Sequence, residues 1–261
     1  MGIVQWRLRK QEGFGAAAAV PVPAAPVADG VSPAFPGERR ADRSAGDTPG
    51  FPARRNIADG SVQPAGSDRP SDDDIARVDW ETLERTVAVC ARCELHRSRT
   101  QTVFGVGNRK AQWMFVGEAP GAEEDRLGEP FVGRAGKLLD AMLAAVGKAR
   151  DEVFIANVLK CRPPNNRDPQ GEEVRQCGAY LLRQIELVNP KLLIALGRFA
   201  AQSLLNTTRP IGKLRGEVFE HAASRKPLVV TYHPAYLLRN PLDKRKAWQD
   251  LCLIKRVSES A

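Results

Sequence analysis

Residues 112–121 read QWMFVGEAPG, an apolar run of strand length that ends in a turn of glycine and proline. Three similar runs follow it along the chain, at residues 153–158 (VFIANV), 191–196 (KLLIAL) and 227–232 (PLVVTY). Each run carries β-branched or aromatic residues and has little of the alternation between apolar and polar side chains that marks a half-exposed strand. Such runs are typical of parallel strands buried on both faces. They predict the central strands of one sheet.

Helical patterns separate these strands at residues 136–146, 172–188 and 198–205, and an amphipathic pattern follows the last strand at residues 243–257. Strands that alternate with helices predict an α/β fold with a mainly parallel sheet covered on both faces. We expect residues 216–220 to add an antiparallel edge strand.

One more helix is expected before the first strand. Ser71 and the carboxylates at residues 72–74 resemble a helix start, because acidic side chains are favourable near the positive end of a helix. Trp80, Leu83 and Val87 then recur at helical spacing. We expect a single helix from Ser71 that leads to the first cysteines.

The first part of the chain has a different composition. Residues 1–74 contain 9 Pro, 9 Gly and 13 Ala and few large apolar side chains, so they cannot bury enough apolar surface to offset the entropy of ordering. We expect a disordered tail over residues 1–74 and one folded domain over residues 75–261. The domain carries 30 Lys and Arg against 21 Asp and Glu, and such a basic surface is compatible with a polyanionic partner such as nucleic acid.

No apolar run reaches the roughly 18–20 residues of a membrane span, and we expect a cytoplasmic protein. The five cysteines are an odd number, which in such a chain favours metal binding or free thiols over a disulfide scaffold. Cys90 and Cys93 form a C-x2-C pair, whereas Cys161 and Cys177 are widely separated. Four thiolates of this kind are compatible with zinc or with an iron–sulfur cluster. Cys252 lies among apolar residues and is expected in the core.

Ligands of parallel α/β sheets bind beyond the carboxyl ends of the strands. Four stretches fall there: residues 117–121, residues 157–161, Gly197 and His233-Pro234. The first is not a dinucleotide fingerprint, because no GxGxxG follows the strand. A glycine turn of this kind suits backbone contact with a flat ligand.

Three side chains near these strand ends are candidates for binding or chemistry. Asn157 interrupts an apolar strand, and a buried amide must hydrogen-bond either a neighbouring loop or a ligand. His233 directly follows the fourth strand, where it is well placed for chemistry. Phe131 lies in a loop of glycine and proline, and from the residues alone we favour a core position over a stacking platform.

Several motifs together resemble the family-4 uracil-DNA glycosylases, the iron–sulfur members of the uracil-DNA glycosylase superfamily. They are the four spaced cysteines, GEAPG at residues 117–121, EPFVGRAG at residues 129–136, the Asn157 strand with residues 160–169 (KCRPPNNRDP), and HPAYLLRNP at residues 233–241. The motifs are specific in combination and in order, and the resemblance covers about residues 76–257.

The resemblance implies a three-layer α/β/α fold with a four-stranded parallel sheet. It implies that Cys90, Cys93, Cys161 and Cys177 hold a [4Fe–4S] cluster, and that the enzyme hydrolyses the N-glycosidic bond of a flipped-out uracil in DNA, leaving an abasic site. We expect a monomer whose tail is available to tether a repair or replication partner.

The resemblance also assigns roles within the substrate pocket. Gly117, Glu118 and Ala119 would lie beside the uracil and its sugar, and Phe131 would stack on the base. Asn157 would read the uracil edge. His233 would reach the uracil O2 atom, and Glu124 would occupy the space near C5.

The resemblance leaves open which residue positions the attacking water. Other members of the superfamily carry an Asp that positions water where this chain has Ala119, an absence that family 4 shares. Glu118 is therefore the candidate for that task. No histidine occurs in residues 160–168, so a covalent link to DNA, as in a related branch, is not expected.

The resemblance also implies contacts with the DNA outside the pocket. Leu237 or Leu238 would wedge into the gap left by the flipped nucleotide, and Arg239 would contact a phosphate.

Two other interpretations of the same motifs predict different biochemical properties. A non-catalytic domain of the superfamily would bind uracil or damaged DNA without cleaving it. A zinc-stabilised α/β protein that acts on nucleotides would contain zinc and no iron.

Overall fold

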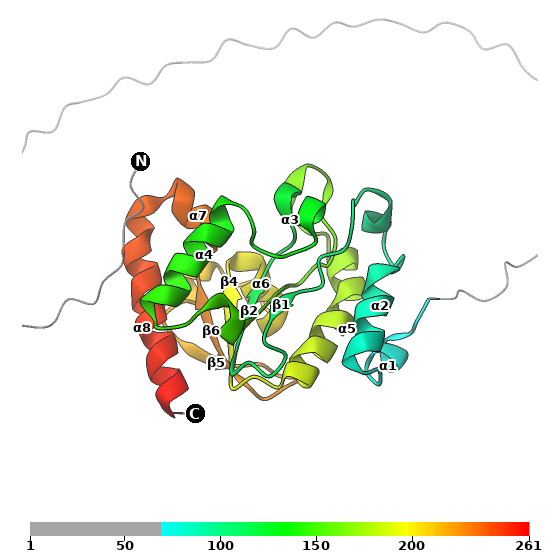
Figure 1. Ribbon diagram of the computed structural model, residues 1–261. Coiled ribbons are helices and arrows are strands. Elements are labelled where there is room, and N and C mark those ends of the chain that lie inside the picture. Colours follow the sequence, from blue (N-terminus) through cyan, green and yellow to red (C-terminus); the bar gives the residue numbers. More distant parts are fainter. Residues whose placement is uncertain (1–68, 261) are drawn as a thin grey trace, which may run out of the picture. The chain divides into compact units, whose positions relative to one another are not determined.

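A computed structural model describes residues 69–260 of the chain (Figure 1), so nearly all of the predicted tail lies outside the described residues. Within that range one six-stranded sheet has the order β1-β3-β2-β4-β6-β5. The strands are β1 (Val106–Gly107), β2 (Trp113–Gly117), β3 (Phe154–Asn157), β4 (Leu192–Leu196), β5 (Val218–Glu220) and β6 (Pro227–Thr231). The central four, β3, β2, β4 and β6, run parallel, and β1 and β5 pair antiparallel at the two edges.

Helices cover both faces of the sheet, as the alternating pattern predicted (Figure 1). The described helices are α1 (Asp72–Ile75), α2 (Trp80–Ala88), α3 (Ala122–Leu127), α4 (Arg134–Ala145), α5 (Gly171–Val188), α6 (Arg198–Leu205), α7 (Pro234–Arg239) and α8 (Lys244–Ser260). None of these helices is long and apolar enough to cross a membrane.

The two faces of each central strand fill two separate cores, because successive side chains of a strand point in opposite directions. In β2, Met114 and Val116 pack with α2, α5 and α6. Trp113 and Phe115 pack on the other side with α4, α7 and α8. Burial on both faces explains why the strands read as continuous apolar runs.

The expected α/β architecture is confirmed, and its details differ at the edges. The antiparallel strand expected near residues 216–220 is present as β5. The resemblance implied four strands, and β1 was not predicted because its two residues, Val106 and Gly107, are too few to give a pattern.

The single helix expected from Ser71 is wrong, because the structure has two. α1 ends at Ile75, and α2 begins anew at Trp80. The Asp79 side chain accepts a hydrogen bond of 2.8 Å from the main-chain N–H of Thr82, and this cap favours a new helix start over continuation of the old one. The folded domain also begins before residue 75, since α1 includes Asp72.

Asp250 on α8 forms an ion pair with Arg215, in the segment before β5, and a hydrogen bond with Thr231 at the end of β6. The Asp250 carboxylate, on α8, accepts two hydrogen bonds from the Arg215 guanidinium, at 2.8 and 3.1 Å, and one from the Thr231 hydroxyl at 2.8 Å. The side chain of Asp250 is 1% exposed and that of Arg215 is 13% exposed. The hydrogen bond from Thr231 ties α8 to the strand end immediately before Tyr232 and His233.

We expect Asp250→Ala to lower the free energy of unfolding by about 3–5 kcal/mol, because it leaves the largely buried Arg215 charge without its carboxylate partner. The matched control is Glu123→Ala, which breaks the exposed pair with Arg126 and should cost about 0.2–1 kcal/mol. Denaturant unfolding of both variants measures the difference. An equal loss of unfolding free energy in the two variants would show that the Asp250–Arg215 pair contributes no more to stability than an exposed pair.

Candidate active site

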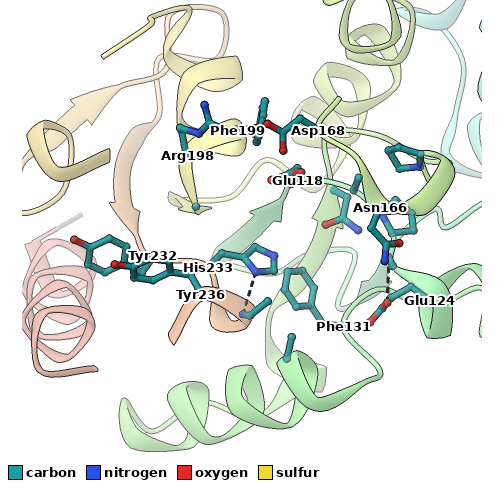
Figure 2. A pocket seen from close by; sticks show the side chains of 18 of the residues that line it. Glu118, Glu124, Phe131, Asn166, Asp168, Arg198, Phe199, Tyr232, His233 and Tyr236 are labelled. Carbon is teal, nitrogen blue, oxygen red and sulfur yellow. Dashed lines mark hydrogen bonds and ion pairs between the residues drawn. The ribbon is translucent and has the colours of Figure 1, made fainter. Parts of the chain in front are cut away.

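A cavity of about 730 Å³ lies at the carboxyl ends of the four parallel strands (Figure 2). This volume is in the range of small-molecule sites. Each predicted strand-end stretch contributes to its lining, which includes Glu118, Ala119, Pro120, Gly121, Glu124, Phe131, Asn157, Gly197 and His233. The structure therefore brings together side chains that the sequence spreads over more than a hundred positions.

Asn157 lines this cavity and carries a buried hydrogen-bond acceptor without a partner among the described residues. It is the last residue of β3 and is 2% exposed, and its Oδ1 atom has no hydrogen-bond partner in the described protein. A buried amide oxygen without a partner costs about 1–3 kcal/mol. Of the two interpretations offered by the sequence, the amide that binds a ligand is favoured over the amide that ties down a loop.

Gly117 is required beside Asn157 for steric reasons. The two residues face each other where β2 and β3 pair. A Cβ atom at position 117 would lie 2.3 Å from Asn157 Oδ1 and 2.7 Å from Phe131 Cζ. Only glycine leaves room for the amide and the ring together.

Phe131 occupies the core position favoured from the sequence, and its role as a stacking platform stays a prediction. It is 5% exposed and packs in the core with α4, and it also lines the cavity. Its ring stacks against the His233 imidazole, with centroids 5.4 Å apart and planes inclined by 30°. Its φ angle of +56° is unusual for a residue with a side chain, and such strain is often found at functional sites.

Gly136 makes that conformation of Phe131 possible. A Cβ atom at position 136 would lie 1.7 Å from the Phe131 carbonyl oxygen. The start of α4 can therefore pack directly under the ring-bearing loop, which explains the glycine in the EPFVGRAG motif.

His233 is held as a neutral imidazole. Its Nδ1 atom accepts a hydrogen bond of 3.1 Å from the main-chain N–H of Ala235. The neutral ring therefore carries its proton on Nε2, from which it can donate. Burial, with a smaller contribution from the Arg239 charge, lowers the pKa of His233 to about 4.

Glu118 lies across the cavity from the imidazole, near Asp168 and Arg198 (Figure 2). Burial, followed by the nearby Asp168 carboxylate, raises the pKa of Glu118 to about 7, while Arg198 acts in the opposite sense. Arg198 is itself paired with Asp168 at 3.1 Å. Glu118 can thus change protonation state near neutral pH, as a general base requires.

The sequence did not single out several lining residues: Asp168, Arg198, Phe199, Tyr232 and Tyr236. For two of these residues the sequence offers a signal that could have identified them. Arg198 follows Gly197 at a strand end, and Tyr232 precedes His233 at another. The ring of Tyr236 stacks on that of Tyr232, with centroids 4.8 Å apart, and extends the aromatic wall of the cavity.

Glu124 braces the loops around the cavity. One carboxylate oxygen accepts from the Gly121 N–H at 3.1 Å, and the other accepts from the N–H groups of Val132 and Gly133 at 3.1 and 3.4 Å. These bonds tie the turn after β2 to the loop that carries Phe131. The place of Glu124 near C5 of a bound base stays a prediction.

The three residues predicted to contact DNA differ in exposure. Leu237 is 1% exposed and packs in the core with α8, so it cannot serve as a wedge in this conformation. This corrects one of the two alternatives: only Leu238, which is half-buried, has part of its side chain accessible. Arg239 is exposed and lines the cavity, where it can reach a phosphate.

The four spaced cysteines line a second, small cavity between α2 and α5, whereas Cys252 lies apart on α8. Arg99 Nη1 donates to Cys161 Sγ at 3.1 Å. Two buried polar atoms of residues that line this cavity, Tyr180 Oη and Arg92 Nη1, have no hydrogen-bond partner in the part of the chain that the structure describes. Among residues 69–260, no three Cys, His, Asp or Glu side chains meet at a point suited to a single metal ion.

Comparison with known proteins agrees with this geometry. Residues 104–252 match the sequence model of the uracil DNA glycosylase superfamily. The chain is 50% identical over 169 residues to a type-4 uracil-DNA glycosylase of Archaeoglobus fulgidus, which covers 62% of this chain and 84% of that protein. It is 47% identical over 161 residues to the type-4 enzyme of Thermotoga maritima, covering 61% and 83%. A type-5 uracil-DNA glycosylase of Pyrobaculum aerophilum is 34% identical over 203 residues, covering 63% and 88%.

We expect Gly117→Ala to destabilise the protein by about 1–3 kcal/mol, because the added methyl group overlaps Asn157 and Phe131. The matched control is Gly178→Ala on α5, whose Cβ atom would meet no atom within 4 Å. That variant should be as stable as the unchanged protein or more so, since alanine favours a helix interior. Chemical unfolding compares the two, and a Gly117→Ala variant of unchanged stability would contradict the steric argument.

Proposed function

The chain belongs to the uracil DNA glycosylase superfamily, within which it is a type-4 uracil-DNA glycosylase, and we propose from this premise how its cavity excises uracil. The enzyme hydrolyses the N-glycosidic bond that joins uracil to its deoxyribose in DNA. The single observation that carries the proposed mechanism is the buried Oδ1 atom of Asn157, which has no hydrogen-bond partner within residues 69–260 and belongs to a residue that lines the cavity together with Phe131 and His233.

Access to the bond requires the uracil to leave the DNA stack, at a cost of a few kcal/mol. Stacking on the Phe131 ring offsets part of this cost, since base–aromatic stacking contributes about 1–3 kcal/mol. The αL backbone of Phe131 and the glycine beneath it support the role, because they fix the ring before the base arrives.

Asn157 selects uracil through the base edge. Its Oδ1 atom accepts from N3–H of uracil, and its Nδ2 group donates to O4. Cytosine has no hydrogen on N3 and carries an amino group in place of O4, so both contacts fail. A site that leaves buried polar groups unpaired with the wrong ligand can discriminate by as much as about 10⁴–10⁵.

His233 stabilises the leaving group. As the glycosidic bond breaks, positive charge builds on the sugar and negative charge on the departing uracil. Nε2–H of His233 donates to the uracil O2 atom, and the hydrogen bond from Ala235 keeps the proton on that nitrogen. A donor aimed at developing charge can be worth about 2.7–4 kcal/mol.

Glu118 orients the attacking water. With Ala119 in the position where other branches carry an Asp, Glu118 is the ionisable group nearest the start of the turn after β2, and its raised pKa suits a base that works near neutral pH. Attack by water on the sugar carbon completes the hydrolysis and leaves an abasic site.

We propose that the cysteine site holds a [4Fe–4S] cluster. Cys90, Cys93, Cys161 and Cys177 supply four thiolates, one for each iron. Arg99 Nη1, which donates to Cys161 Sγ, and the Tyr180 hydroxyl, which has no partner within residues 69–260, are donors available to sulfur acceptors. Bound there, the cluster would pin the segment before β2 to the segment after β3 and to α5, which is a structural role.

Incubation with a uracil-containing oligonucleotide, followed by alkali, tests the function directly. We expect strand cleavage at the uracil position and none in a thymine-containing control. An intact strand at stoichiometric protein would indicate a domain that binds uracil without cleaving it.

We expect Asn157→Asp to lower the ratio of uracil to cytosine excision by at least about 100-fold, because the carboxyl group no longer matches both atoms of the uracil edge. Single-turnover rates on matched uracil and cytosine oligonucleotides measure this ratio. If the ratio stays at the value of the unchanged enzyme, Asn157 does not read the base.

The single-turnover rate should fall as the pH drops through about 7, because protonation of the Glu118 carboxylate removes the base. His233 should contribute no inflection to the pH–rate profile near the ordinary pKa of a histidine, since its lowered pKa keeps the imidazole neutral at that pH. Glu118→Gln should be slow and should lose this pH dependence. An inflection near 7 that persists in Glu118→Gln would assign it to another group.

A further inference from the structure

Lys160 is buried between the cysteine site and the strand end that carries Asn157. The residue is 1% exposed. Its Nζ atom donates to the main-chain carbonyl oxygen of Asn157 at 2.8 Å and to Gln184 Oε1 at 2.6 Å. Gln184 is fixed in turn, because its Nε2 atom donates to the Phe104 carbonyl at 3.0 Å. All members of this network are buried.

The ammonium group occupies an energetically expensive position. A buried charge is costly unless it is paired. Both of its acceptors are neutral, and no ion pair joins Lys160 to a carboxylate within residues 69–260. With four thiolate ligands, the cluster of the neighbouring site would be anionic and would offset this charge. The main-chain N–H of Lys160 already donates to Cys177 Sγ at 3.3 Å.

The Asn157 carboxamide depends on its backbone for orientation. Its Oδ1 atom makes no hydrogen bond within the described protein. Its backbone is held on one side by β2, where the N–H of Val158 donates to the Gly117 carbonyl at 3.0 Å. The Lys160 ammonium holds the Asn157 carbonyl itself, at the point where β3 ends.

We propose that Lys160 is a positioning residue for uracil recognition: its buried ammonium fixes the Asn157 carbonyl and so aims the carboxamide at the uracil edge. The inference rests on the proposed function and deepens it. Lys160 does not touch the substrate. It acts through Asn157, and it connects the reading residue to the helix that carries Cys177.

The test compares the protein with Lys160→Met, which keeps the side chain's length and removes its charge. Two duplexes are used as binding probes, one with non-hydrolysable 2′-fluoro-2′-deoxyuridine and one with an abasic analogue at the same position. The ratio of the two affinities isolates recognition of the base. We expect Lys160→Met to lower this ratio by about 10- to 100-fold, the usual effect of losing a group that orients another, while affinity for the abasic duplex stays unchanged.

Trp113→Phe is the control, because it removes a partly buried hydrogen bond, the 2.8 Å contact from Trp113 Nε1 to Ser258, at the opposite end of β2. It should leave the ratio unchanged. Iron content and visible absorption establish whether Lys160→Met retains its cluster. An unchanged affinity ratio in Lys160→Met that retains its iron would overturn the proposal.

If Lys160→Met loses its iron, Gln184→Met tests the proposal in its place. It removes the second acceptor of the ammonium and lies outside the cysteine site. We expect it to lower the ratio in the same direction by several-fold, and an unchanged ratio in this variant would overturn the proposal in that case. If the unchanged protein itself shows no preference for the uracil duplex, the proposed function fails, and not the role of Lys160 within it.

Discussion

The site depends on the close approach of β2 and β3 at their carboxyl ends, where Gly117 and Asn157 face each other. The missing side chain at Gly117 leaves room for the Asn157 amide and the Phe131 ring. Within residues 69–260 the amide oxygen has no partner, so its hydrogen-bonding capacity is unused. In the proposed mechanism, base stacking on Phe131 and recognition of the uracil edge by Asn157 take their geometry from this approach.

The cavity shifts the pKa values of two of its ionisable groups, His233 and Glu118, in opposite directions. The His233 imidazole is kept neutral and is supplied with a fixed proton, whereas the Glu118 carboxyl is brought close to neutral pH. The same burial produces both shifts, because a low-dielectric cavity disfavours the charged form of either group. One group is suited to donate to a leaving anion and the other to orient water, so the two roles do not compete.

The sequence was sufficient for the layered fold and for the strand ends that form the cavity, because runs buried on both faces and helical spacing are local patterns. It could not show that Asp79 starts a new helix or that Leu237 packs inward, since both depend on tertiary contacts. Asp168 and Arg198 were missed because each reads as an ordinary surface charge until the chain places them beside Glu118. The buried environment of Lys160 was equally hidden, since its acceptors lie 3 and 24 residues away.

A crystal structure of the protein with free uracil is the decisive test of the proposed pocket. We expect uracil to stack on Phe131, with its N3–H donating to Asn157 Oδ1 and its O2 accepting from His233 Nε2. Uracil bound elsewhere, or bound in this cavity while Asn157 Oδ1 stays unpaired, would contradict it.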